Sequence, residues 1–192
     1  MKSLSLSTPH VLIMVGIPGS GKTFFAAKFA ETFHAPYVAS EKILAFLPDN
    51  PEAAETLTNY QLDELLKTHQ SIIYEGDTAS RVKRIELAKK ARSAGYETLI
   101  IWVQTDQPTA QARTAKTAKD KGLSQSEEDY EKLLKRFTAP AAPEKPVVIS
   151  GRHTYASQAK VVLQRLTTAR TALSTQAAPP ARPEPRRNIT IR

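Results

Sequence analysis

Cysteine is absent from the 192 residues of the sequence. Disulfide bridges, zinc sites built on thiolates and cysteine nucleophiles are therefore excluded. A chain without thiols is typical of proteins that work in a reducing compartment. We therefore expect a cytoplasmic protein.

Long apolar runs are also missing. No stretch approaches the roughly 20 apolar residues that a membrane-spanning helix needs. The first residues carry a lone Lys2 and no small-residue cleavage site, so they do not resemble a secretion signal. We expect no membrane partner for this chain.

Acidic residues are fewer than basic ones, with 19 Asp and Glu against 27 Lys and Arg, which gives a formal net charge of +8. A basic balance favours anionic partners, either phosphorylated small molecules or nucleic acid. Part of the excess lies in residues 174–192, where four arginines and one glutamate occur in an Ala- and Pro-rich stretch. We expect this stretch to be a disordered basic tail, which could contact nucleic acid.

The most specific motif follows the apolar run 11–15 and reads Gly16-Ile17-Pro18-Gly19-Ser20-Gly21-Lys22-Thr23. It fits G-x-x-x-x-G-K-[ST], a loop whose backbone N–H groups surround phosphates at the start of a helix. In such a loop Lys22 reaches the β- and γ-phosphates, and the Thr23 hydroxyl holds Mg²⁺. The motif predicts a nucleotide site built from Gly16, Pro18, Gly19, Ser20, Gly21, Lys22 and Thr23.

Short apolar runs at 11–15, 37–39, 71–74, 98–103 and 147–149 alternate with helical stretches. This alternation predicts a three-layer α/β fold with a five-stranded parallel sheet and helices on both faces. We expect a flexible lead-in over 1–10, one domain over 11–173 and the tail over 174–192. In the helix capped by Ser80, the predicted apolar face consists of Val82, Ile85, Leu87, Ala88 and Ala91.

Three acidic residues follow predicted strands. Glu41 comes directly after the run 37–39, and Glu75 and Asp77 follow the run 71–74. Glu41 suits the first turn of a helix, but it also lies at the edge of the sheet where open α/β folds bind ligands. An acid directly after a buried strand suits a second Mg²⁺ contact or a base. We therefore expect these carboxylates to share a pocket with the phosphate loop.

A basic segment follows the fourth strand. Arg113, Lys116 and Lys119 recur at helical spacing with Lys121 just beyond, and a polar hinge around Gly122 precedes another helix that runs to about Phe137. A solvated charged face is one interpretation. The alternative is a lid, over about 113–137, that closes on phosphates.

Taken together, the loop Gly16–Thr23, the segment Glu75-Gly76-Asp77 and the basic lid from Arg113 resemble the P-loop kinases, a group of AAA-type ATPases and kinases. This family includes polynucleotide 5′-hydroxyl kinase domains and related nucleotide and small-molecule kinases. The resemblance covers about residues 11–166. It implies the P-loop NTPase fold, with ATP and Mg²⁺ as cofactors.

The resemblance also implies roles for single residues. Glu41 stands where the family has an Asp that takes the proton of the acceptor hydroxyl, and Glu75 matches the acid after the third strand that contacts the metal. Arg113 matches an arginine of the lid. Leu44 stands where the family has an arginine that binds the acceptor's phosphate, and Thr117 replaces a second lid arginine.

The sequence therefore predicts an ATP-binding phosphotransferase that moves the γ-phosphoryl group to a hydroxyl acceptor. The acceptor stays open between a small molecule, a nucleotide and a polynucleotide 5′ end. The predicted catalytic residues are Lys22, Glu41 and Arg113, and the predicted metal ligands are Thr23 and Glu75. An ATPase without a separate acceptor and a nucleotide-dependent nucleic-acid-binding module remain the alternatives.

Overall fold

A computed structural model of the chain describes residues 6, 8–120 and 127–176, with side chains up to residue 168. Lys121, the polar hinge around Gly122 and the tail from residue 177 lie outside the described residues, as does most of the predicted lead-in. No helix of the described ranges is both long enough and apolar enough to cross a bilayer.

A five-stranded parallel sheet forms the centre of the fold, in the order β2-β3-β1-β4-β5. The predicted parallel sheet is thereby confirmed, and the strand order is what the structure adds. Strand β1 is central and carries the phosphate loop, and β3 pairs with it directly. The strands are β1 (His10–Val15), β2 (Tyr37–Ala39), β3 (Ile72–Glu75), β4 (Glu97–Gln104) and β5 (Val147–Ser150).

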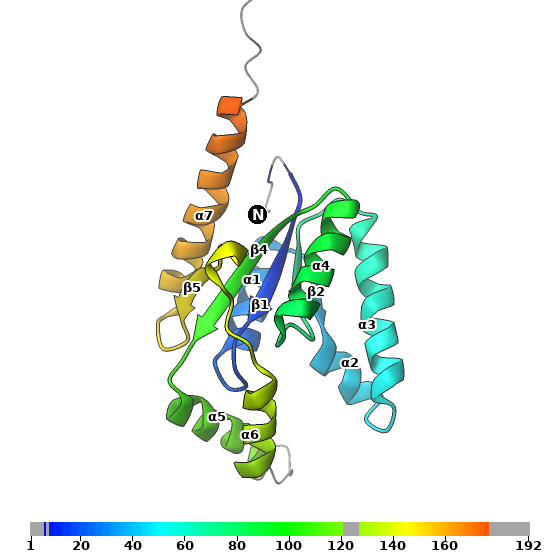
Figure 1. Cartoon of the computed structure of the whole chain (residues 1–192), viewed down its shortest axis with the longest axis vertical. Helices are drawn as coiled ribbons and strands as arrows, with labels where there is room; N and C mark the ends of the chain where they lie inside the picture. Colours follow the sequence, from blue (N-terminus) through cyan, green and yellow to red (C-terminus); the bar gives the residue numbers. More distant parts are fainter. Residues whose placement is uncertain (1–5, 7, 121–126, 177–192) are drawn as a thin grey trace, which may run out of the picture.

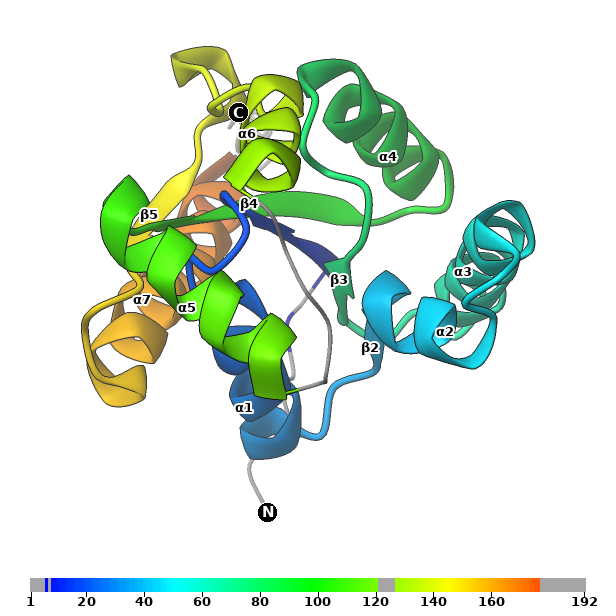
Figure 2. The same ribbon diagram turned by 90° about the horizontal axis from the view of Figure 1, so that it is seen from below.

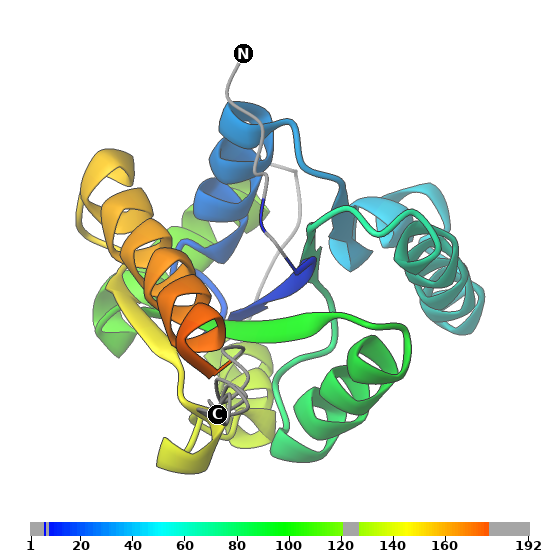
Figure 3. The same ribbon diagram turned by 90° about the horizontal axis from the view of Figure 1, so that it is seen from above.

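Helices cover both faces of the sheet, as the three-layer prediction requires. Figure 3 shows α1 and α7 on one face and α3 and α4 on the other. In Figure 1, α5 and α6 lie beyond the carboxyl ends of the strands. The helices are α1 (Lys22–Phe33), α2 (Ser40–Phe46), α3 (Pro51–Leu66), α4 (Arg81–Ser93), α5 (Gln107–Asp120), α6 (Glu127–Arg136) and α7 (Tyr155–Gln176), with a 3-10 turn, η1 (Ala142–Glu144).

The apolar run of β1 is continuous because each face of the sheet has its own core. Leu12 and Met14 pack with α1 and α7, whereas Val11, Ile13 and Val15 pack with α3 and α4. All five side chains are fully buried. Burying a side chain of this kind contributes roughly 1.5–3 kcal/mol, so β1 is a rigid support for the loop that follows it.

The prediction for the apolar face of α4 is wrong at two positions. Ser80 caps the helix as expected, but Val82 and Ile85 are 64% and 51% exposed. Leu87, Ala88 and Ala91 do face the sheet, and Arg84 is buried beside them. A hydrophobic pattern cannot reveal this arrangement, because a charged residue takes a core position only when distant partners satisfy it.

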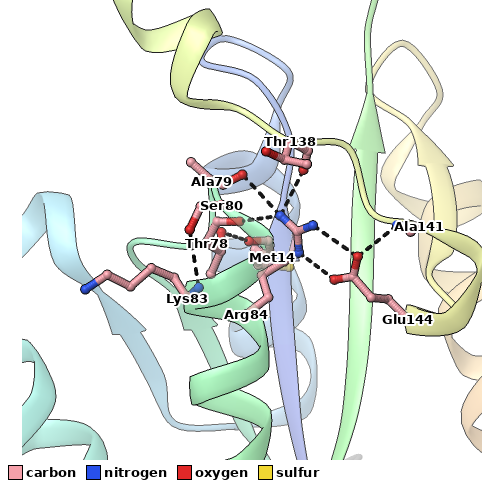
Figure 4. Close-up of polar contacts among 9 residues, drawn as sticks. All are labelled: Met14, Thr78, Ala79, Ser80, Lys83, Arg84, Thr138, Ala141 and Glu144. Atoms are coloured by element: carbon pink, nitrogen blue, oxygen red, sulfur yellow. Dashed lines mark hydrogen bonds and ion pairs between the residues drawn. The ribbon is translucent and has the colours of Figure 1, made fainter.

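The buried guanidinium of Arg84 joins three segments (Figure 4). Its Nε and Nη2 donate to the two carboxylate oxygens of Glu144 at 2.7 and 3.1 Å. Its Nη1 donates to the carbonyl oxygens of Thr78, Ala79 and Thr138 at 2.9–3.1 Å. Arg84 thus connects α4 to the loop after β3 and to the chain that leaves α6. We call Arg84, Glu144 and these three carbonyls the Arg84 knot.

Burial disfavours the ionised form of Glu144, but hydrogen bonds and the charge of Arg84, with the N–H of Ala141, hold its pKa below the usual range. A carboxyl whose pKa is lower in the folded state stabilises the fold at pH values above its unfolded pKa. That contribution is lost as the pH falls through the lowered pKa. The Arg84 knot is therefore stable at neutral pH and weakens in acid.

We expect Arg84→Met to lower the free energy of unfolding by about 3–5 kcal/mol, because the change removes the guanidinium donors from a buried carboxylate and from three carbonyls. Arg92→Met, on the exposed side of the same helix, should change it by less than about 0.5 kcal/mol. Urea unfolding measures both values. Glu144→Gln should also lower the free energy of unfolding, and its difference from the unmodified chain should become smaller below about pH 4. A loss under 1 kcal/mol in Arg84→Met contradicts this account.

Candidate functional site

The loop Gly16–Thr23 connects β1 to α1 at the carboxyl edge of the sheet. Gly19 has a φ of +76°, and a Cβ atom there would lie 2.0 Å from the carbonyl oxygen of Ala110 in α5. Only glycine fits this backbone and this close approach. Ser20 is fully buried, and its Oγ has no hydrogen-bond partner among the described residues. The loop therefore has the backbone shape and the spare polar capacity of an anion cradle.

The Lys22 ammonium lies inside the loop. Its Nζ donates to the carbonyl oxygens of Gly16 at 2.9 Å and Ile17 at 3.1 Å. Burial lowers the pKa of Lys22, and the nearby carboxylates of Glu75 and Glu41 act in the opposite direction. Two backbone carbonyls thus hold a cation that phosphate oxygens can bind in their place.

The carboxylate of Glu75 joins three elements at the end of β3. It is only 6% exposed. Thr23, in the first turn of α1, donates its hydroxyl to Oε1 at 2.7 Å, and Tyr37 of β2 donates its hydroxyl to Oε2. Burial, the hydrogen bond to Glu75 and nearby negative charge raise the pKa of Tyr37, so the phenol stays protonated and keeps donating.

Thr23 and Glu75, the two predicted metal ligands, fit a Mg²⁺ ion by chemistry and proximity. Both offer oxygen atoms, and the two atoms are in direct contact. Mg²⁺ is usually bound by one or two protein oxygens together with substrate phosphates and water, rather than by a cage of protein ligands. Among the described residues there is no cluster of three or more His, Asp or Glu that could hold a metal alone. A hydroxyl and a single carboxylate therefore suit an ion that arrives with a nucleotide.

A cavity of about 510 Å³ opens next to the ends of β2 and β3, between α2 and α3 on one side and α4 on the other. Glu41, in the first turn of α2, and Asp77, after β3, both line it. Glu41 is exposed, and its charge acts on Lys22 and Tyr37. Glu41 therefore lines the cavity and also contributes negative charge near Lys22 of the phosphate loop.

Helices α5 and α6 lie against the phosphate loop, as the view onto the carboxyl edge of the sheet indicates (Figure 2). The buried Tyr130 of α6 donates to the carbonyl oxygen of Pro18 at 3.4 Å. Arg113 of α5 donates from Nη1 to the carbonyl oxygen of Gly151 at 3.1 Å, and this nitrogen lies 4.0 Å from where a Cβ of Gly21 would be. Arg113, Lys116 and Lys119 are all exposed, and of these three Arg113 has a hydrogen bond to Gly151 beside the loop.

Tyr37 and Tyr130 contact the site, and the sequence did not single them out. Tyr37 is 38 positions from Glu75, and parallel pairing of β2 with β3 brings them together. Tyr130 is 112 positions from Pro18. A tyrosine in a short strand or an amphipathic helix carries no motif of its own. For Tyr37, the strand order would have been a signal, since it places β2 beside β3.

The described geometry can be compared with known proteins. A family model described as AAA domain matches residues 11–140. A search of the curated proteins finds no match. Among solved structures, a gluconokinase from Sinorhizobium meliloti 1021 has a TM-score of 0.65 at 13% identity, over 91% of this chain and 100% of that one. A sugar kinase from a Janibacter species has a TM-score of 0.58 at 19% identity, over 85% of this chain and 97% of that one.

A third similar structure is that of the Pnkp1/Rnl/Hen1 RNA repair complex. Its TM-score is 0.59 at 19% identity, and the match covers 69% of this chain and 45% of that one. At these identities the structures show a shared fold, and the family model covers the phosphate loop, Glu41, Glu75, α5 and α6. The chain therefore belongs to the AAA domain family, with the P-loop fold that these kinase structures share.

Proposed function

We propose that this protein is an ATP-dependent phosphotransferase that moves the γ-phosphoryl group to a hydroxyl acceptor. The observation that carries the proposal is the junction of two compartments at one edge of the sheet. The loop with Lys22, Thr23 and Glu75 suits a nucleotide, and the 510 Å³ cavity next to it suits a second molecule. Glu41 lines the cavity and adds negative charge near Lys22 of the loop.

The donor side uses positioning and charge. Backbone N–H groups of the loop and the Lys22 ammonium bind the phosphates, while Thr23 and Glu75 hold Mg²⁺. The bound ion neutralises charge on the phosphate oxygens. Arg113, in the middle of α5, adds positive charge near the transferring group. Helices α5 and α6 keep water away from the loop, since they cover it directly.

On the acceptor side, Glu41 serves as the general base. As the acceptor oxygen attacks the γ-phosphorus, its proton passes to the Glu41 carboxylate. A new phosphorus–oxygen bond forms to the acceptor, the bond from the γ-phosphorus to the bridging oxygen breaks, and ADP leaves. This role fits a carboxylate that no other described residue holds in an ion pair.

The adjacent cavity favours transfer to an acceptor over simple ATP hydrolysis. Water needs no pocket of this size, whereas small-molecule sites typically enclose roughly 300–1,000 Å³. The test is ATP consumption by the full chain with and without hydroxyl acceptors. Turnover that requires an acceptor supports the proposal. Equal turnover without any acceptor identifies an ATPase instead.

We expect Lys22→Ala to weaken ATP binding by about tenfold or more and to reduce turnover by about 10²-fold or more, since the phosphates lose their cation. Lys28→Ala removes an exposed lysine of the same helix and should leave both values unchanged. Calorimetry with a non-hydrolysable ATP analogue and a coupled ADP assay measure the two effects. Normal ATP affinity in Lys22→Ala contradicts the assigned binding mode.

Glu41→Gln should keep nucleotide affinity within about twofold but lower the rate of transfer by about 10²–10⁴-fold, because the amide cannot take the acceptor proton. Glu31→Gln, an exposed position on α1, is the matched control. Single-turnover transfer from labelled ATP isolates the chemical step. A fully active Glu41→Gln rules out Glu41 as the base.

Tyr37→Phe removes one hydroxyl that orients Glu75 and leaves the packing of the ring in place. We expect the Mg²⁺ concentration that half-saturates activity to rise by about tenfold, as is usual when a partner of a ligating carboxylate is lost. Tyr60→Phe, at an exposed position of α3, should leave it unchanged. A Mg²⁺ titration of both variants provides the comparison. An unshifted midpoint in Tyr37→Phe argues against Glu75 as a metal ligand.

A further inference from the structure

The cavity beside the phosphate loop has a charge opposite to that of the whole chain. The sequence carries a formal net charge of +8, yet the cavity lining holds four carboxylates, two ammonium groups and no arginine. The charged lining residues are Glu41, Glu55, Asp77, Glu86, Lys83 and Lys90.

The two lysines are already engaged by acids. Lys83 Nζ lies 3.5 Å from Oε1 of Glu55 and 4.0 Å from Oδ2 of Asp77. Lys90 Nζ lies 2.7 Å from Oδ1 of Asp63, which is outside the lining. The positive charge that faces the cavity is therefore already neutralised by the protein.

Two carboxylates stay available. Within the described ranges, Glu41 and Glu86 take part in no ion pair. Negative charge in the cavity also affects Tyr74, which lines it. Burial together with the charges of Asp77 and Glu55 raises the pKa of Tyr74 to about 12. A ligand in the cavity therefore meets a negative potential and uncompensated acceptors on both walls, Glu41 on α2 and Glu86 on α4.

The rest of the lining is partly apolar. Leu62 and Leu87 are buried beside Tyr74, and Leu44 projects from α2 at the position where the resembling kinases have an arginine. An apolar wall at this point offers no donor to a phosphate or a carboxylate. It suits the carbon face of a compact polyol, whose hydroxyl groups then point to the polar rim.

We propose that the acceptor is a small hydroxylated amine, that is, an amino sugar, an aminocyclitol or a related amino alcohol. Its ammonium group binds Glu86, and one of its hydroxyl groups faces Glu41. This inference rests on the proposed phosphotransferase function and names its substrate class. Phosphorylated acceptors, including nucleotides, are rejected because they would bring further negative charge into a cavity with an excess of carboxylates.

Sets of compounds that differ mainly in charge test the proposal. One set is glucosamine, glucose and glucuronate, and the other is streptamine, inositol and inositol phosphate. Binding of each compound to the full chain is measured by calorimetry with a non-hydrolysable ATP analogue present. We expect the amine of a set to bind at least about fivefold more tightly than the neutral compound, and the anion to bind most weakly.

The variant Glu86→Gln should remove this preference. The amine should lose about fivefold in affinity, while the neutral compound of the same set keeps its affinity. Glu97→Gln, an exposed glutamate at the opposite edge of the sheet, should alter neither. The proposal is overturned if an anion binds most tightly or if none of the compounds binds. It is also overturned if Glu86→Gln leaves the affinity for the amine unchanged.

The ADP assay with the same compounds separates this inference from the proposed function. An anion that supports ATP turnover better than the amine upholds the phosphotransferase and overturns the acceptor class. An amine that binds through Glu86 without stimulating ATP turnover upholds the cavity's preference and overturns the phosphotransferase.

Discussion

A carboxylate that leaves water must replace its hydration with hydrogen bonds, and Glu75 does so with hydroxyls from two other elements. Thr23 comes from α1 and Tyr37 from β2, so this one buried group fixes the spacing of the phosphate loop, the second strand and the third strand. The strand order makes the contact possible, because β3 lies between β2 and β1. Without the order β2-β3-β1, the loop and its acid would not lie on adjacent strands.

The sequence predicted those features whose cause is local. The phosphate loop, the five strands and the cap at Ser80 depend on residues a few positions apart, and the structure has them where they were expected. The candidate acids at the strand ends could also be found, since carboxyl ends of parallel strands share an edge. The burial of Arg84 and the role of the Tyr37 hydroxyl could not be predicted, because their carboxylate partners lie 60 and 38 positions away and leave no periodic pattern.

The phosphate loop and the cavity differ in how far the sequence predicts them, and the reason is the same. A loop that surrounds phosphates requires glycines at fixed spacing, so the phosphate loop can be recognised in a single segment. The cavity is lined by residues of α2, α3, β3 and α4, and most of these residues are unremarkable in their own segments. Only the folded arrangement brings Glu41 and Glu86 to facing walls with Lys83 and Lys90 already neutralised. The charge of the cavity is therefore a property of the tertiary structure.

The Arg84 knot has a consequence for the way the molecule opens. Its two charged members are 60 positions apart, and the chain between them includes β4, α5 and α6. Their ion pair closes this long stretch of chain without a covalent bond, and it forms only when the fold is complete. Detaching the exit of α6 at Thr138 would take one carbonyl acceptor from the buried guanidinium and would break the bond from the Thr138 N–H to the carbonyl oxygen of Ala79. Helices α5 and α6 therefore belong to the same cooperative unfolding unit as the sheet, and their anchored end should melt with the core rather than before it.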